Sequence, residues 1–284
     1  MDKLPPIIRT KIILPSRRAE LLTRHRLLNA LTDLMDRRLI IIAAPAGYGK
    51  TSLLIDFSHQ VEWPVCWYAL DPLDQDLFRF AAYLISALQV RFPDFGSSAL
   101  QTLENLSQEQ PNLDLLVAAI VNDAYEHINE HFILVLDDFH LVDSSKPVNQ
   151  FINRFLQDMD ENCHIITASR TLLTLPDLPL MVARSQVGGL SFEELAFLPA
   201  EIQGFFLQNQ HVAIPDNQAE DLARLIRQLF DQGKSIIVIE HNMTFAMQLC
   251  QRVVVLAQGQ IIASGPPAQI RADERVINAY LGQE

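Results

Sequence analysis

Short hydrophobic runs alternate with longer amphipathic stretches along the first two hundred residues. Four of the runs, at 39–43, 65–70, 132–136 and 163–168, are almost continuously apolar. A strand that is covered on both faces has this composition, whereas a half-exposed strand alternates apolar and polar positions. The pattern therefore predicts buried strands of a parallel sheet.

The amphipathic stretches between these runs predict helices. Leucines at helical spacing mark residues 21–34, an aromatic stripe marks 78–92, and apolar positions after a capping Asn112 mark 112–130. The remaining expectations are helices at 148–159 and from 190 onward, a fifth short strand at 181–187 and a polar loop at 96–111. Strands that alternate with helices indicate an α/β fold with a five-stranded, mainly parallel sheet flanked by helices.

A loop of small residues follows the first apolar run, from Ala44 to Thr51. The order of strand, loop, Gly-Lys-Thr and helix is typical of a phosphate-binding loop, although Ala44 stands where the motif usually has its first glycine. A glycine-rich turn without a ligand is the alternative. The interpretation as a P-loop NTPase assigns nucleotide contacts to Ala46, Gly47, Tyr48, Gly49, Lys50, Thr51 and Ser52.

The residue types in this loop suit the binding of a polyphosphate. Gly47 and Gly49 let the backbone N–H groups approach an anion closely at the N-terminus of the following helix. Lys50 is expected to reach the β- and γ-phosphates, and the Thr51 hydroxyl to help hold Mg²⁺.

A second motif lies where the third apolar run ends in Asp137 and Asp138. Open α/β sheets bind their ligands at the carboxyl ends of their strands, so this pair is expected near the phosphate loop. We assign Asp137 to the metal, together with Thr51, and Asp138 to polarisation of the attacking water. A strand that ends in Asp-Asp is a weak signal alone, and its position after the phosphate loop and the intervening helices strengthens it.

Other polar residues near predicted strand ends have two interpretations each. Arg170 follows the fourth run and could sense the γ-phosphate, as a catalytic residue, or form a surface ion pair. Asp71 and Asp74 follow the second run as turn and cap residues or as an acidic cluster near the metal. His140 is either a structural histidine or a site residue.

Composition indicates a globular protein with an uneven charge. The chain has 284 residues, 49% hydrophobic content and a net charge of −12, while residues 1–50 carry ten Lys or Arg against four acidic residues. A basic N-terminal segment can indicate nucleic-acid binding, but here it leads directly into the phosphate loop. We therefore expect attraction for a nucleotide, and no direct DNA binding.

The lack of a targeting signal in the sequence and the use of cysteine lead us to expect a cytoplasmic protein. No apolar run approaches the ~20 residues that span a bilayer, and the N-terminus lacks the apolar segment of a signal peptide. Cys66, Cys163 and Cys250 lie in apolar surroundings and are too few and too far apart for a disulfide framework. We expect buried thiols and no membrane insertion.

The chain from residue 11 to about 206 resembles the nucleotide-binding domain of the MalT-type signal-transduction ATPases of the LuxR class. The matching segments are 22–27, 44–51, 67–71 with Asp74, 136–140, 167–170 and 194–197. The resemblance implies ATP or ADP as a conformational switch, slow hydrolysis and self-association in the ATP state. Such regulators continue into sensor and DNA-binding domains that this sequence lacks, which suggests a truncated regulator.

The last sixty or so residues resemble the end of an ABC-transporter ATPase of the branched-chain amino-acid subclass, through 225–243 and 252–282. The resemblance implies that His241 corresponds to a switch histidine. The chain has no ABC signature loop and no second phosphate loop, so we interpret this part as a fragment, a small α+β appendage with a hairpin of 252–256 and 260–264.

These expectations define a domain plan and a leading function. The plan places the P-loop domain at 1–206, including a basic arm and helix at 1–36, a linker at 207–221 and the ABC-like fragment at 222–284. The leading function is an ATP/ADP-binding module and slow Mg²⁺-dependent ATPase switch. The alternatives are an ATP-binding subunit of an ABC transporter for branched-chain amino acids, in contact with a permease, and a non-catalytic interaction remnant.

Overall fold

A computed structural model describes residues 5–106, 112–198, 200–202, 247, 250–257 and 260–276. The chain divides into two compact units, residues 1–201 and 202–284, and each is described by itself. The expected linker at 207–221 and the switch-type His241 lie outside the described residues. The expected domain boundaries stay predictions.

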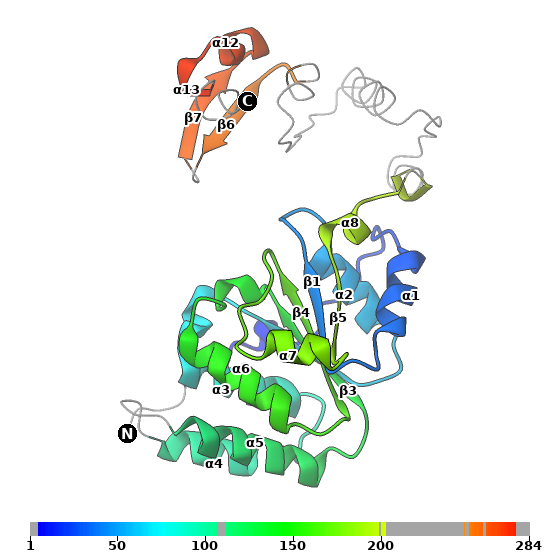
Figure 1. Ribbon diagram of the computed structural model, residues 1–284, viewed down its shortest axis with the longest axis vertical. Coiled ribbons are helices and arrows are strands. Elements are labelled where there is room, and N and C mark those ends of the chain that lie inside the picture. Colours follow the sequence, from blue (N-terminus) through cyan, green and yellow to red (C-terminus); the bar gives the residue numbers. More distant parts are fainter. Residues whose placement is uncertain are drawn as a thin grey trace. The chain divides into compact units, whose positions relative to one another are not determined.

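The first unit is built on a five-stranded sheet with the order β2-β3-β4-β1-β5 (Figure 1). The strands are β1 (Leu39–Ala43), β2 (Val65–Ala69), β3 (Phe132–Asp137), β4 (Cys163–Ser169) and β5 (Val187–Leu190). All neighbouring strands run parallel. The carboxyl ends of all five strands therefore meet at one edge of the sheet, as the α/β prediction requires.

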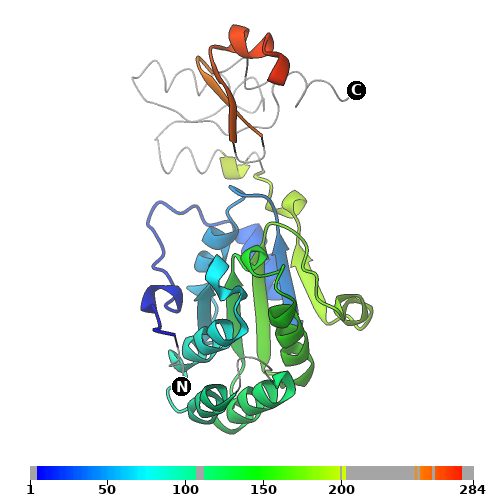
Figure 2. The same cartoon turned by 90° about the vertical axis from the view of Figure 1, so that its left-hand side faces the viewer.

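Helices cover both faces of this sheet (Figure 2). On one face, α1 (His25–Asp33) and α2 (Lys50–Ser58) pack against the side chains of Ile40, Ile42 and Val135. The other face carries α3 (Leu77–Gln89), α4 (Ser97–Asn105), α5 (Leu113–His127) and α6 (Lys146–Asp158). The central strands are buried on both sides, which explains their continuously apolar sequences.

The N-terminal arm, residues 5–24, is fastened to the sheet unit along its length. Ile12 packs in the cluster on the α3 face, whereas Leu14 packs against the cluster on the α2 face. Arg17 Nε lies 2.6 Å from Asp56 Oδ1 on α2 and fixes the arm there. The arm thus passes from one face of the sheet to the other.

A polar clamp joins the end of the arm to the end of the first unit. Arg24 is buried, and its guanidinium donates to the carbonyls of Leu195 and Ala196 at 2.9 Å each. The same group lies 2.9 Å from the Glu201 carboxylate, which also pairs with Arg26 at 3.3 Å. The clamp holds α8 (Phe192–Leu195) beside the start of α1.

Two of the predicted elements are wrong in detail. Residues 97–105 of the expected polar loop form α4, because Asp123 on α5 accepts hydrogen bonds from the backbone N–H groups of Gly96, Ser98 and Ala99. A helix cap that comes from a distant helix has no local sequence signal.

The fifth strand is also shifted along the chain. Residues 178–183 form the short helix α7 (Leu178–Ala183), which has a proline in its first turn, and the strand is β5 instead. A Cβ on Gly189 of β5 would lie 2.5 Å from the Ile41 carbonyl oxygen, so close packing requires glycine there. Because two of its four residues are glycine, β5 lacks the continuous apolar run that predicted the other strands.

The second unit contains the expected hairpin. Strands β6 (Val253–Ala257) and β7 (Gln260–Gly265) pair antiparallel and precede two short helices, α12 (Pro267–Arg271) and α13 (Glu274–Val276). A small core of Val253, Val255, Ala263, Ile270 and Val276 holds these elements together. Among the described residues of the whole chain, no helix is long and apolar enough to cross a membrane.

Candidate functional site: a phosphate loop beside two carboxylates

The loop between β1 and α2 contains two glycines in a left-handed backbone conformation. Gly47 and Gly49 have φ angles of 88° and 76°, a region that glycine occupies without strain. A Cβ built on either glycine meets no atom within 4 Å, so the space beside the loop backbone is open. Gly49 is the N-cap of α2 and makes no side-chain cap, which leaves the first N–H groups of the helix for an anion.

Lys50 is folded back onto this loop. Its Nζ donates to the carbonyl oxygens of Ala44 at 2.6 Å and Pro45 at 3.0 Å. The residue is 8% exposed, and burial lowers the pKa of its ammonium group, a shift that the charges of Asp138 and Asp137 oppose and that of Arg170 reinforces. The ammonium has neutral carbonyls as its hydrogen-bond partners, so a phosphate oxygen would be a stronger partner.

Thr51 and Asp137 join the phosphate loop to the end of β3. The Thr51 hydroxyl donates to Asp137 Oδ1 at 3.1 Å, and the backbone N–H of Asp138 donates to the same oxygen at 3.1 Å. Asp137 is buried, and this burial together with the charge of Asp138 raises the pKa of its carboxyl to about 6, although both hydrogen bonds oppose the shift.

Asp138 begins a tight turn in a left-handed backbone conformation. Its φ is 60°, and the following residues form the turn η3 (Phe139–Leu141). The Asp138 side chain is half exposed, and His140 Nδ1 lies 3.8 Å from its Oδ1. Burial and the nearby charge of Arg170 lower the pKa of His140, so its ring is predominantly neutral at neutral pH.

The end of β4 lies between the two motifs, because β4 pairs with both β1 and β3. Ser169 is opposite Ala43, and its carbonyl accepts a hydrogen bond from Ala44 N at 3.2 Å. Arg170 is exposed, and its charge acts on both Lys50 and His140. The γ-phosphate sensor and the surface ion pair both stay predictions for Arg170.

The residues present suit a nucleotide with Mg²⁺. The open glycine loop and the buried Lys50 suit phosphates, and the adjoining hydroxyl of Thr51 and carboxylate of Asp137 are oxygen donors of the kind Mg²⁺ prefers. Within the described part of the chain, no cluster of three or more His, Cys, Asp or Glu side chains forms a metal cage. Mg²⁺ commonly binds through one or two protein oxygens and substrate phosphates instead.

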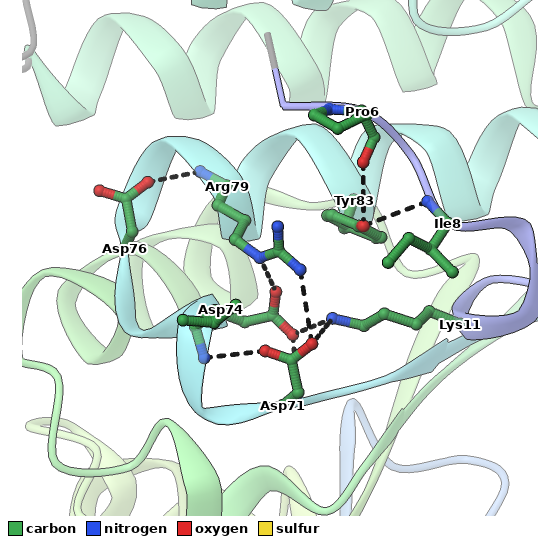
Figure 3. Close-up of polar contacts among 9 residues, drawn as sticks. Pro6, Ile8, Lys11, Asp71, Asp74, Asp76, Arg79 and Tyr83 are labelled. Atoms are coloured by element: carbon green, nitrogen blue, oxygen red, sulfur yellow. Dashed lines mark hydrogen bonds and ion pairs between the residues drawn. The ribbon is translucent and has the colours of Figure 1, made fainter.

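Asp71 and Asp74 form a structural cluster near this edge (Figure 3). They make a reciprocal capping box at η2 (Pro72–Gln75), and both pair with Lys11 and Arg79. The turn-and-cap interpretation of the two aspartates therefore describes their contacts. Sequence reasoning missed Lys11, because nothing local pairs it with residues sixty positions away.

Two of the three cysteines are buried, as expected, and Cys250 is half-buried. Burial raises the pKa of Cys66 to about 12 and that of Cys163 further still. Thiols of this kind are protonated at neutral pH and unreactive.

Comparison with known proteins supports both resemblances. Over 203 residues, 70% of the chain, the sequence is 34% identical to the HTH-type transcriptional regulator MalT of Yersinia pestis (strain Pestoides F). The MalT of Yersinia enterocolitica is also 34% identical, over 202 residues. The chain spans 22% of the length of these relatives, so most of MalT has no counterpart in the match.

The C-terminal end matches a different family, described as "Branched-chain amino acid ATP-binding cassette transporter", over residues 260–284. The two resemblances drawn from the sequence are therefore confirmed, one with MalT over most of the chain and one with the ABC family at its end.

Solved structures with a similar fold include a Walker-type ATPase of Pyrococcus abyssi and the ORC1 protein of Aeropyrum pernix in complex with DNA. The first has a TM-score of 0.46 and 19% identity, and the match covers 74% of this chain and 65% of that one. The second has a TM-score of 0.43 and 18% identity, and the match covers 78% and 56%.

Proposed function

We propose, from its MalT-like region, that this protein binds ATP or ADP with Mg²⁺ and works as a slow ATPase switch. The observation that carries the proposal is the hydrogen bond between Thr51 and Asp137, which joins the phosphate loop to the acidic end of β3. The two residues lie on different elements, and they meet where P-loop NTPases hold their metal.

Lys50 supplies the positive charge for the phosphates. Binding would exchange its contacts with the Ala44 and Pro45 carbonyls for contacts with β- and γ-phosphate oxygens. The backbone N–H groups of residues 46–52 would donate to the same phosphates at the N-terminus of α2.

Thr51 and Asp137 would hold the Mg²⁺, which neutralises charge on the phosphates when it is bound. Asp138 is the residue that we assign to the attacking water, because its side chain is partly exposed directly beside Asp137. Arg170 supports the γ-phosphate from the end of β4. Hydrolysis that relies on one partly exposed carboxylate is expected to be slow.

The test is a calorimetric titration of the full chain with ADP and ATP, with and without Mg²⁺. We expect Lys50→Ala to weaken nucleotide binding by at least about tenfold, because a charge-assisted contact to phosphate is lost. Lys146→Ala is the matched control, since Lys146 is an exposed lysine at the start of α6, and it should leave the affinity unchanged.

A wild-type chain that binds neither nucleotide would overturn the proposal. The same holds for Lys50→Ala behaving like wild type. Nucleotide binding without ATP hydrolysis would support the nucleotide-switch part of the proposal and refute the ATPase part.

A further inference from the structure

The segment of residues 70–75, which follows β2 and includes η2, holds the acidic turn Asp137–Leu141 at both ends. The backbone N–H of Leu70, just before η2, donates to the Asp137 carbonyl at 3.0 Å. At the other end, Gln75 Nε2 donates to the Leu141 carbonyl at 2.9 Å, and Ser145 Oγ donates to the Gln75 carbonyl at 2.7 Å. Asp138 lies between these attachments, in a left-handed conformation that the surrounding structure must maintain.

The shape of η2 depends on the buried carboxylate of Asp74. The residue is 0% exposed, and its carboxylate accepts hydrogen bonds from the Asp71 backbone N–H at 2.8 Å and from Arg79 Nε at 2.9 Å. A buried carboxylate is costly unless its hydrogen bonds and charge are compensated. The conformation of η2 is therefore linked to the cations that reach Asp74.

One of those cations comes from the N-terminal arm (Figure 3). Lys11 Nζ lies 2.5 Å from Asp74 Oδ2 and 2.8 Å from Asp71 Oδ2, and it also lies 4.4 Å from the centre of the Tyr83 ring. The Tyr83 hydroxyl holds the arm again, because it accepts from Ile8 N and donates to the Pro6 carbonyl, both at 3.1 Å. The arm is thus anchored at the carboxyl end of β2, the strand that runs beside Asp137.

We propose that Lys11 and Gln75 are positioning residues for the acidic turn Asp137–Leu141. The N-terminal arm thereby helps to form the metal-nucleotide site. Lys11 acts through Asp74 and η2, and Gln75 acts through its bond to Leu141. Neither residue is among those that we assign to the nucleotide or the metal. The inference rests on the proposed function, because the property that it explains is the dependence of nucleotide binding on Mg²⁺.

The experiment compares ADP dissociation constants in Mg²⁺ and in EDTA for the full chain and its variants. In Lys11→Met and Gln75→Ala, we expect the Mg²⁺-dependent gain in affinity to fall by about three- to tenfold, the scale of one lost hydrogen bond or ion pair. Affinity in EDTA should change by less than about twofold, because the phosphate loop keeps its contacts. Lys11→Arg should restore most of the gain, since a guanidinium can also bridge two carboxylates.

Gln89→Ala is the matched control. Gln89 Nε2 donates to the Phe95 carbonyl at 3.1 Å, the same kind of bond as that of Gln75, on the far part of α3. Its Mg²⁺-dependent gain should equal that of wild type. Thermal unfolding followed by circular dichroism identifies a variant that fails to fold, and the exposed Gln75 carries the test if Lys11→Met is such a variant.

The outcomes separate the inference from the proposed function. If wild type binds ADP more tightly with Mg²⁺ and the folded variants keep the full gain, the positioning role is refuted and the nucleotide site remains. If wild type shows no Mg²⁺-dependent binding, the proposed function fails and the inference fails with it. A variant that loses affinity equally in both buffers also contradicts the positioning role.

Discussion

The Thr51 hydroxyl donates to Asp137 Oδ1 at 3.1 Å, between the first turn of α2 and the last residue of β3. The strands β3, β4 and β1 are adjacent in the sheet and run parallel, so all three end at the same edge. This shared edge brings the two residues together. Under the proposed function, this pair is the protein's contribution to the metal, and removal of the hydroxyl tests it.

We predict that Thr51→Val reduces the Mg²⁺-dependent gain in ADP affinity by about tenfold. Valine keeps the side-chain volume of threonine but lacks the hydroxyl oxygen that would bind the metal. Thr51→Ser keeps the donor and should retain most of the gain. Calorimetry in Mg²⁺ and in EDTA measures both. An undiminished gain in Thr51→Val would mean that this hydroxyl is not a metal ligand.

The buried clamp of Arg24 leads to a prediction about stability. Arg24→Met leaves the Leu195 carbonyl without its donor, and Arg26 remains the donor to the Ala196 carbonyl and the ion-pair partner of Glu201. We expect a loss of about 2–4 kcal/mol in the free energy of unfolding. Urea unfolding measures the loss. Arg154→Met removes an exposed pair with Asp158 and should cost less than about 1 kcal/mol. Equal effects of the two substitutions would show that the Arg24 clamp adds nothing beyond a surface ion pair.

His164 leads to a prediction about pH. It is buried, stacked on Trp63 and bonded to the Arg37 carbonyl at 3.0 Å, and burial lowers its pKa below the usual 6.5. The unfolded chain therefore takes up this proton at a higher pH than the folded chain does. Stability should fall as pH drops through about 6.5 toward the lower folded pKa.

The difference between wild type and His164→Asn isolates this contribution, because asparagine does not titrate there. Urea unfolding between pH 8 and pH 5 should give a shallower decline for the variant. His25→Asn, which replaces an exposed histidine at the start of α1, should keep the wild-type slope. Parallel profiles for wild type and His164→Asn would contradict the prediction.

The tertiary cap of α4 gives a further stability prediction. Asp123→Ala removes the acceptor of the Gly96, Ser98 and Ala99 N–H groups, and we expect a loss of about 1–3 kcal/mol with faster hydrogen exchange in α4. The exposed Glu104 on the same helix is the control, and Glu104→Ala should change stability by less than about 0.5 kcal/mol. Unchanged exchange in Asp123→Ala would show that α4 does not need this cap.

The sequence by itself determined the strands with continuous apolar runs, the phosphate loop and the acidic end of β3. These features are local, since burial on both faces selects apolar residues and the loop needs glycine at fixed positions. The residue pattern alone therefore locates Gly47, Gly49 and Asp137, and the common edge of a parallel sheet predicts that they meet.

The tertiary structure alone decided the features that depend on distant partners. Helix α4 is capped by Asp123, which lies on α5. Gly189 of β5 lies against the Ile41 carbonyl, where a larger residue would not fit. Lys11 forms ion pairs with carboxylates just after the end of β2. Such contacts join residues that are far apart in the chain, and their energies depend on burial that a sequence pattern does not record. The sequence showed the arm only as a basic N-terminal segment. Under our inference, the arm positions the acidic turn through the contacts of Lys11.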